Sequence, residues 1–351
     1  MDKRVKNILE LINKYNDCYI VGGYVRDYLL GINSNDYDIC TSATIDKLKE
    51  ILYKYKYTIE FNTMHIKFDN INIDITPYRK EYKYNKRKPI LYYDTNKLEE
   101  DLIRRDFTIN TICMDSNNNI LDILNGKNDI DNKVIKCVGN IDNKLTEDPL
   151  RILRAFRFST YLNFRIDEEL ENAIKKYGYL LKDISYEIKK RELDKIIEYK
   201  GLDIIKKYNL EKYLDIDLSN IKYYKYNILT WMNIDYFNKY CITRKEKKTI
   251  KLINELSKTK LDNYDLYTYG LDICNLVGEY MGIDLKSRYD KLPIKCRKDI
   301  LVSSDEILKI VKNKRDINNI YIILEKNILM GTLINDKNEI IDYLYKKYDR
   351  I

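Results

Sequence analysis

The stretch YIVGGYVRDYLLGINSNDYDICTSA, residues 19–43, decides the expected fold. An apolar run over residues 19–21 predicts a buried strand, which stops at Gly22 and Gly23. Apolar residues then follow at helical spacing, and a polar turn leads into a second strand at residues 36–39. We therefore expect a strand, a glycine turn, a short helix and another strand in close succession.

Two aspartates occupy alternate positions at the start of that second strand. Successive side chains of a strand point to opposite faces, so Asp36 and Asp38 are expected to lie side by side. Adjacent carboxylates repel unless a cation lies between them, and hard divalent cations such as Mg²⁺ take oxygen ligands of this kind. A pair of such ions can activate an attacking hydroxyl group and stabilise a leaving phosphate oxygen. The pattern predicts phosphoryl or nucleotidyl transfer, although a DxD also occurs on strands that have no such role.

The glycines and a nearby arginine add a phosphate-binding pattern. Gly22 and Gly23 let backbone N–H groups approach a triphosphate, and the planar guanidinium of Arg26 suits phosphate. The sequence contains neither GxxxxGK[ST] nor GxGxxG, which excludes a P-loop and a dinucleotide fingerprint. A third carboxylate, Asp74, lies on a later expected strand. It either faces the same ions or points outward as a structural aspartate.

Length and charge set wider limits. The chain has 351 residues, enough for about two to three domains of ordinary size. It carries 63 Lys and Arg against 55 Asp and Glu, a formal net charge of +8 that is spread along the sequence. This balance suits a nucleic-acid partner, although many proteins without such a partner are equally basic.

Cysteine, histidine and apolar content narrow the class further. The seven cysteines are widely spaced without a CxxC, so we expect free thiols in a reducing cytoplasm and neither disulfides nor a zinc site. His65 is the single histidine, which excludes mechanisms that need a histidine cluster, and we expect it to pack on a strand. No apolar run approaches the roughly 18 residues of a membrane span, and the first residues lack a signal-type apolar core. We therefore expect a soluble protein without a membrane partner.

Strand signals concentrate before residue 125, and helical periodicity prevails after residue 147. Expected strands cover residues 19–21, 37–40, 66–68, 71–76 and 112–114, with a helix over 45–55. The fold class is therefore α+β, with a mixed head over 1–125, a helical neck over 126–200 and a helical body and tail over 201–351. Residues 80–97 are polar, basic and aromatic without a clean period, which we interpret as a solvated loop. A loop of that length is often functional, so it is a candidate substrate contact.

A second cluster lies in EEDLIRRDFTINTICMD, before an apolar strand. It contains Arg104, Arg105, Asp106 and Asn110. Two arginines beside an aspartate can form a surface salt bridge. Because a triphosphate is already expected, we assign one arginine to phosphate and the polar side chains to a ribose hydroxyl group.

A third cluster, LTEDPLRILRAFRFSTYLNF, predicts a helix that starts at Thr146 or Glu147 and has Pro149 in its first turn. Its buried side is supplied by apolar residues, namely Ile152, Leu153, Phe156 and Phe158. Three polar residues at intervals of three are expected to share another face: Asp148, Arg151 and Arg154.

This third cluster has the chemistry to select a base. A carboxylate only accepts hydrogen bonds and a guanidinium only donates them, so Asp148 and Arg151 form a complementary pair. Cytosine and adenine present an exocyclic amine beside a ring nitrogen acceptor, whereas uracil and guanine present a carbonyl and an N–H. The pair would admit CTP and ATP, and a buried mismatch can cost about 10⁴-fold. The alternative is an intrahelical ion pair worth roughly a few tenths of a kcal/mol.

Taken together, the motifs resemble one family. GGYVRDYLLG, DYDICTSAT, RRDFTIN, EDPLRILRAFRF and the weaker ISYEIKKRELDKII are similar, in order and spacing, to the bacterial-type tRNA nucleotidyltransferase/poly(A) polymerase family, specifically its CCA-adding enzymes. The resemblance covers roughly residues 18–197. It implies a polymerase-β-like head, a neck that selects the nucleotide, and a body and tail that hold the tRNA. It also implies Mg²⁺ as cofactor, CTP and ATP as substrates and the tRNA 3′ end as acceptor.

The resemblance also implies residue roles. It assigns Asp36 and Asp38 to the Mg²⁺ ions, Gly23, Arg26 and Arg105 to the triphosphate, Asp106 and Asn110 to the ribose, Asp148 and Arg151 to the base, and Arg154 and Arg157 to the rest of the pocket. Asp74 stands where relatives commonly have glutamate, so its contribution stays open.

Relatives carry a flexible loop linked to the final A addition. The matching positions here are Arg79, Glu81, Tyr84, Arg87 and Pro89, which favours complete CCA addition. Three alternatives remain: a poly(A) polymerase of the same family, an enzyme that adds only CC or only A, and a non-catalytic tRNA-binding module.

Overall fold

The structure is a computed structural model that describes residues 1–85, 88–235, 238–240, 243–311 and 313–348, with only the backbone described over 82–94. The chain divides into two compact units, Met1–Leu218 and Ser219–Ile351. Throughout these described ranges, no helix has both the length and the apolar character needed to cross a membrane. The six cysteines they contain are free thiols.

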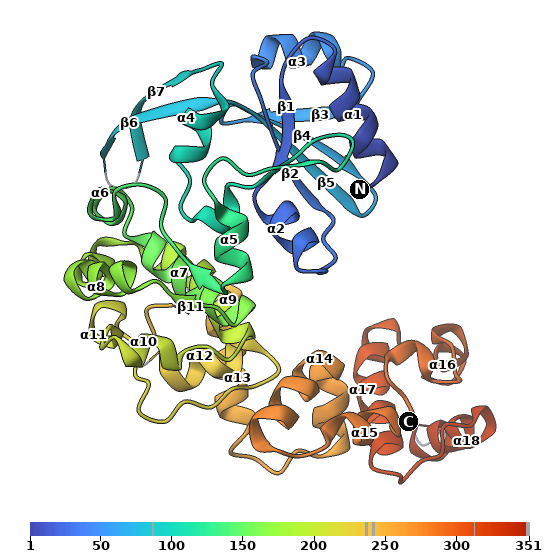
Figure 1. Ribbon diagram of the computed structural model, residues 1–351. Helices are drawn as coiled ribbons and strands as arrows, with labels where there is room; N and C mark the ends of the chain where they lie inside the picture. The colour runs from blue at the N-terminus through green and yellow to red at the C-terminus, as the bar shows by residue number, and fades with distance from the viewer. Residues whose placement is uncertain (86–87, 236–237, 241–242, 312, 349–351) are drawn as a thin grey trace. The chain divides into compact units, whose positions relative to one another are not determined.

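The first unit is built on a seven-stranded mixed sheet in the order β3-β4-β5-β2-β1-β8-β9 (Figure 1). The strands are β1 Cys18–Val21, β2 Asp36–Thr41, β3 Tyr57–Glu60, β4 Thr63–Phe68, β5 Ile71–Pro77, β8 Cys113–Met114 and β9 Ile120–Leu121. β2 runs parallel to β5 and antiparallel to β1. The five expected strands are confirmed to within a few residues, and β3 and β9 were missed.

Helices and short elements complete this unit. The helices are α1 Lys3–Asn13, α2 Gly23–Leu29, α3 Ile45–Ile51, α4 Leu98–Ile103, α5 Gly126–Asp131, α6 Ile141–Glu147, α7 Leu150–Leu162, α8 Glu168–Tyr177, α9 Tyr186–Glu198, α10 Asp203–Lys207 and α11 Glu211–Leu214. The 3₁₀ turns are η1 Thr108–Asn110 and η2 Gly178–Asp183, and β10 Val134–Ile135 pairs in parallel with β11 Arg165–Ile166. The helix expected over 45–55 ends earlier, at Ile51.

The pleat of β2 separates the core from the site. Tyr37 is buried, whereas Asp36 and Asp38 are exposed on the opposite face. Cys40, on that same face by alternation, packs in an apolar cluster with Leu102 of α4. The covered part of this face therefore ends before the two aspartates, which stay accessible.

Residues 80–97 do not form the expected loop. β6 (Arg79–Asn85) and β7 (Lys88–Asp94) pair antiparallel as a separate two-stranded sheet. Although this segment is polar, tyrosine alternates with lysine in it. Tyrosine favours strands, so this alternation is consistent with the hairpin. Arg79 and Glu81 form an ion pair with Nε and Oε1 2.8 Å apart. Of the other loop positions, the side chains of Tyr84 and Pro89 and all of Arg87 lie outside the described residues.

The helix expected from Thr146 or Glu147 begins later. Both residues belong to the end of α6, and α7 begins at Leu150. Asp148 lies between α6 and α7. Its backbone is extended, with φ −141° and ψ 92°, because Pro149 disfavours a helical conformation for the residue directly before it. The Asp148 Oδ1 atom accepts a hydrogen bond from the Leu150 N–H at 3.1 Å. Asp148 therefore stands in front of α7 and not on a helical face.

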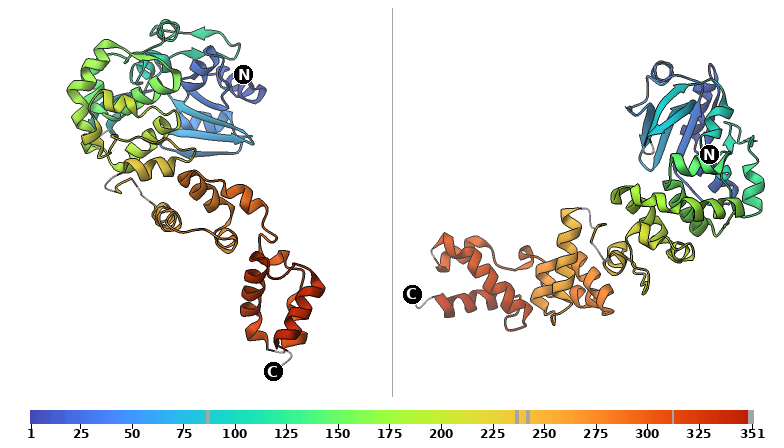
Figure 2. Two further views of the ribbon diagram at one scale, coloured as in Figure 1. Left: turned by 90° about the horizontal axis from the view of Figure 1, so that it is seen from below. Right: turned by 90° about the vertical axis from the view of Figure 1, so that its left-hand side faces the viewer.

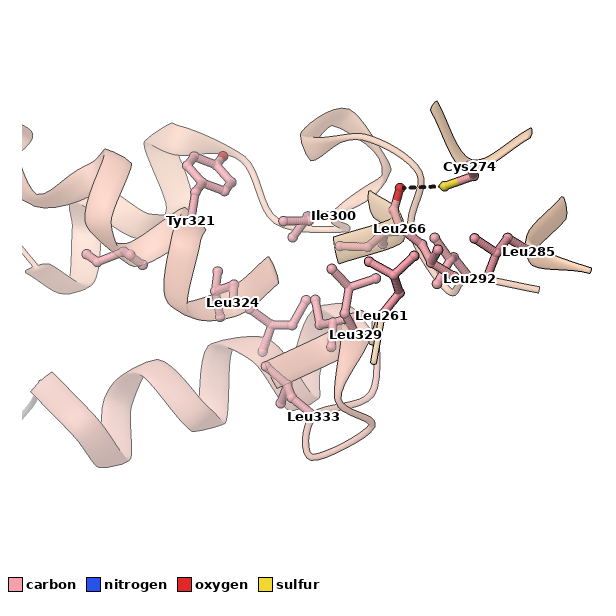
Figure 3. Packing of buried hydrophobic residues seen from close by; sticks show 14 of the residues in the cluster. Leu261, Leu266, Cys274, Leu285, Leu292, Ile300, Tyr321, Leu324, Leu329 and Leu333 are labelled. Carbon is pink, nitrogen blue, oxygen red and sulfur yellow. Dashed lines mark hydrogen bonds between the residues drawn. The ribbon is translucent and has the colours of Figure 1, made fainter. Parts of the chain in front are cut away.

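The regular elements among the described residues of the second unit are all helices or 3₁₀ turns, as expected. Its helices are α12 Asn227–Ile234, α13 Arg244–Leu256, α14 Asn263–Met281, α15 Leu285–Asp290, α16 Ser304–Val311, α17 Ile317–Leu329 and α18 Lys337–Tyr348, with 3₁₀ turns η3 Arg297–Asp299 and η4 Lys314–Asp316 (yellow through orange to red in Figure 2). Leu266, Leu285 and Leu324 lie in one leucine-rich core of these helices (Figure 3). In that core the Cys274 thiol donates to the Leu266 carbonyl oxygen at 3.7 Å.

Candidate active site

One cavity of about 500 Å³ in the first unit collects nearly all of the expected site residues. Its lining includes Gly22, Gly23, Arg26, Asp38, Arg105, Asp106, Asn110, Asp148, Arg151, Arg154 and Arg157. It also includes Arg104, the other arginine of the second cluster, and two residues that the sequence did not indicate as site residues, Phe158 and Lys195. Seven cationic side chains face three carboxylates there. The cavity therefore suits a polyanion.

Gly22 forms the turn from β1 into α2. Its backbone has φ 83° and ψ −132°, a conformation open to glycine and strained for other residues. A Cβ atom at this position would lie 3.6 Å from Arg105 Nη1 and 3.7 Å from Asp38 Oδ2. Glycine therefore permits the turn and also keeps the space between that guanidinium and that carboxylate open.

The aspartate pair lies at the edge of this cavity. Asp38 lines it, whereas Asp36 faces a neighbouring cavity and accepts a hydrogen bond from Asn72 Nδ2 at 2.6 Å. Desolvation raises the pKa of Asp38; the Arg105 charge opposes this shift, and Asp74 and Asp36 add to it. The Asp38 carboxylate is therefore only partly compensated by the cations of the protein.

The neighbouring cavity has a volume of about 790 Å³ and is lined by both aspartates. Asp74, directly opposite Asp38 in the β2–β5 register, also lines it. The Asp74 Oδ1 atom lies 2.8 Å from His65 Nδ1, so His65 serves the strand surface as expected. This arrangement places Asp74 beside the pair instead of on the far face.

The donor chemistry can be tested against the implied Mg²⁺. Over the part of the chain that the structure describes, no three His, Cys, Asp or Glu side chains converge into a group that could hold a metal ion. Asp36 and Asp38 nevertheless offer accessible carboxylate oxygens, the donors that Mg²⁺ prefers. Mg²⁺ commonly keeps water and substrate phosphate oxygens as its other ligands. The pair therefore fits a divalent cation that is bound together with a nucleotide.

Asp101 organises the two adjacent arginines. It is fully buried and accepts hydrogen bonds from Arg104 Nε at 2.9 Å and from Arg105 Nη2 at 3.1 Å. Burial raises the pKa of Asp101, but the two guanidinium groups outweigh it and lower the pKa overall. The Nε atom of Arg105 is buried and has no hydrogen-bond partner among the described residues. Asp101 thus determines where the Arg105 guanidinium points.

Asp106 is the centre of a buried polar network. It accepts hydrogen bonds from Arg154 Nε at 2.7 Å, Asn110 Nδ2 at 3.0 Å and the Phe107 N–H at 2.8 Å. Burial would raise the pKa of Asp106, but the Arg154 charge and these hydrogen bonds hold it well below its usual range. The Asn110 Oδ1 atom accepts from Arg26 Nη1 at 2.8 Å. The network links the glycine turn to α7.

Phe158 is a platform for guanidinium groups. The Cζ atoms of Arg26, Arg154 and Arg157 lie 5.0, 5.6 and 4.3 Å from its ring centroid, within cation–π range. Arg157 Nη1 also donates to Glu192 on α9 at 2.8 Å. Phe158 was expected on the buried side of α7 and is buried, but it also forms part of the cavity wall.

Arg151 is held by backbone oxygens. Its Nη1 donates to the Lys144 carbonyl at 2.7 Å and its Nη2 to the Arg104 carbonyl at 3.4 Å. Glu147 lies 3.6 Å from Nη1 as an ion pair. Asp148 lines the same cavity from the residue just before α7. The expected donor and acceptor are thus both present at one site, with the donor fixed in orientation.

Comparison with known proteins identifies the family of this chain. Residues 18–136 match the family described as the Poly A polymerase head domain. The CCA-adding enzyme of Ligilactobacillus salivarius is 31% identical to this chain, and the aligned region covers 97% of this chain and 95% of that enzyme. The CCA-adding enzyme of Listeria innocua is 32% identical, covering 92% and 93%.

Solved structures share the fold. The Bacillus stearothermophilus CCA-adding enzyme in complex with CTP has a TM-score of 0.76 at 23% identity, covering 100% of this chain and 99% of its own. The Thermotoga maritima CCA-adding enzyme complexed with tRNA has a TM-score of 0.62 at 20% identity, covering 99% and 96%. Relatives more than 30% identical span almost the whole sequence, so this chain belongs to the family of CCA-adding enzymes.

Proposed function

We propose that the protein adds CCA to the 3′ end of tRNA, taking CTP twice and ATP once and releasing pyrophosphate each time. One observation carries the proposal: Asp38, Arg105 and Arg151 line a single cavity. Nucleotidyl transfer with base selection needs a metal-binding carboxylate, a triphosphate ligand and a base-recognising group around one nucleotide. The names of the relatives support the same activity.

The triphosphate binds along the glycine turn. Arg105 Nη1 borders the space above Gly22, where a phosphate oxygen can approach the guanidinium and the backbone N–H groups together. Asp36 and Asp38 would hold Mg²⁺, which when bound neutralises phosphate charge and favours the ionised form of an attacking hydroxyl group. Arg26 supports this end of the site through its hydrogen bond to Asn110.

The ribose and base extend toward α7. Asp106 and Asn110 offer polar groups for the ribose, and Asp148 accepts from the exocyclic amine while Arg151 donates to the ring nitrogen. Cytosine and adenine satisfy both partners, whereas uracil and guanine leave both unmatched. Selection therefore needs no template, because the protein supplies the complementary groups. Arg154 and Arg157, against Phe158, complete the wall.

We assign one role to each of the three regions of the chain. In this proposal residues 1–125 form the catalytic head, residues 126–200 select the nucleotide and residues 201–351 bind the tRNA. A reducing cytoplasm suits the free thiols.

The test uses a tRNA that lacks its last three nucleotides, incubated with Mg²⁺ and with each NTP alone and in mixtures. Products resolved one nucleotide at a time should show two additions from CTP, a third from ATP after CTP, and none from UTP. Long A tails without use of CTP would identify a poly(A) polymerase instead. Products that stop at CC, or that accept only A, would identify a partial enzyme. Binding of tRNA with no incorporation would identify a binding module.

A further inference from the structure

Lys144 carries a buried ammonium group that neither the motifs nor the proposed chemistry uses. It lies in α6 and is 8% exposed. Its Nζ donates to the Ile103 carbonyl at 2.8 Å and to the Arg105 carbonyl at 3.2 Å. The Lys144 side chain therefore holds the backbone of residues 103–105, which include Arg105.

The backbone of Lys144 takes part in a second set of contacts. Its carbonyl accepts from Arg151 Nη1 at 2.7 Å, and the Arg104 carbonyl accepts from Arg151 Nη2 at 3.4 Å. Arg104 lies within the segment that the Lys144 ammonium binds. The contacts therefore form a closed ring that runs from Lys144 Nζ through residues 103–105 to Arg151 and back to the Lys144 carbonyl.

We propose that Lys144 is a positioning residue that fixes the guanidinium of Arg151 relative to that of Arg105. It thereby sets the distance between base recognition and triphosphate binding. This inference rests on the proposed function, because it assigns Arg151 to the base and Arg105 to the triphosphate. Lys144 does not line the cavity and acts only through these two arginines.

The surroundings of the ammonium group argue against a role in packing alone. Burial and, to a smaller extent, the Arg151 charge lower the pKa of Lys144 to about 8, although Cys137, Glu147 and Glu81 oppose this shift. A cation beside another buried cation is costly, and an apolar side chain would fill the same space without that cost. Its value lies in donating to two carbonyl groups at once, which an apolar side chain cannot do.

A second buried lysine provides a matched control. Lys189 of α9 is 1% exposed, and its Nζ donates to the Tyr213 carbonyl at 3.4 Å. It does not line the cavity. Lys189→Met therefore removes a buried ammonium group of the same kind without touching residues 103–105 or Arg151.

The experiment compares wild-type protein with Lys144→Met, Lys144→Arg and Lys189→Met. For each, kcat/KM for CTP and for UTP is measured on a tRNA lacking its 3′ nucleotides, and urea unfolding is recorded. Equilibrium binding of CTP and UTP is measured in parallel. A displacement of about 1 Å at a reacting site can cost 10²-fold, so Lys144→Met should reduce the preference for CTP over UTP by roughly 10- to 100-fold.

Lys144→Arg, which keeps donors for both carbonyls, should recover most of that preference. Lys189→Met should lose stability and keep the preference. If Lys144→Met does not fold, Lys144→Gln replaces it, and its single amide donor should give a smaller loss in the same direction. An unchanged preference in the Lys144 variants, with CTP and UTP affected alike as in Lys189→Met, would overturn the inference.

The proposed function fails separately, by absence of transfer from the wild-type protein. In that case the equilibrium binding of CTP and UTP to each variant still tests whether Lys144 affects the preference for CTP.

Discussion

Replacing Asp101 by asparagine tests how Arg105, the proposed triphosphate ligand, is held. The Asp101 carboxylate is 0% exposed and contacts Arg104 Nε at 2.9 Å and Arg105 Nη2 at 3.1 Å. Asparagine keeps the size but removes the charge, so two largely buried guanidinium groups lose the counterion that they share, and among the described residues Arg104 keeps only its ion pair with Glu81 at 3.6 Å. Removing one partner of a buried ion pair costs about 3–5 kcal/mol. We expect the free energy of unfolding to fall by about that amount.

Urea unfolding and the KM for CTP are the assays for Asp101→Asn. Because the released Arg105 guanidinium loses its orientation, KM should rise together with the loss of stability. Glu99→Gln is the matched control, since Glu99 is an exposed acid in the first turn of the same helix, and it should change stability by no more than about 0.5 kcal/mol. Equal effects of the two substitutions, or an unchanged KM in Asp101→Asn, would refute this account of the arginine pair.

Three further substitutions separate folding from activity. The pKa of Asp106 lies below the ~3.9 of an unfolded aspartate, so its stabilisation is complete above about pH 4 and is lost as the pH falls toward the folded value. Asp106→Asn should therefore lower stability at pH 7 and reduce the further loss of stability at acidic pH. Urea unfolding midpoints measured as a function of pH check this expectation. Gly22→Ala should lower the free energy of unfolding by about 1–3 kcal/mol and kcat/KM for CTP by at least roughly tenfold. Gly31 also has a positive φ, but the space around its Cβ position is open, so Gly31→Ala should lower stability and leave kcat/KM unchanged. Asp38→Asn should abolish transfer while leaving unfolding free energy equal or higher, because it relieves a desolvated and crowded carboxylate; a marked loss of stability would contradict this.

The features predicted correctly from sequence are those set by neighbouring residues. A glycine pair after an apolar run produces the turn at Gly22, since only glycine adopts its φ of 83° without strain. Alternation along β2 places Asp36 and Asp38 on one face for the same local reason. These two local rules were enough to predict the glycine turn and the paired aspartates at this end of the sheet.

Two errors came from local rules that were applied incompletely. Pro149 suits the first turn of a helix, but it also restricts Asp148 to an extended backbone, so α6 ends at Glu147 before α7 begins. The alternation of tyrosine and lysine in β6 was obscured by the high charge of that segment. The spacing of Asp101, Arg104 and Arg105, at intervals of three and four, was a signal for their ion pairs that went unused.

The remaining partners could not be predicted from local patterns. Lys144 reaches the Ile103 carbonyl across 41 residues of sequence, and Arg157 reaches Glu192 across 35. Such pairs depend on how α6, α7 and α9 pack, which no short motif encodes. The sequence thus predicts the chemical groups of the site, and the tertiary structure determines how they are held.

The most direct test of the central claim measures base selection by Asp148. Steady-state kcat/KM for CTP and for UTP is determined on the same shortened tRNA with wild-type protein and Asp148→Ala. The wild-type protein should prefer CTP by about 10⁴-fold, and Asp148→Ala should bring the two nucleotides to within roughly tenfold of each other. Equal use of CTP and UTP by the wild-type protein, or an undiminished preference in Asp148→Ala, would contradict selection by a complementary carboxylate and guanidinium.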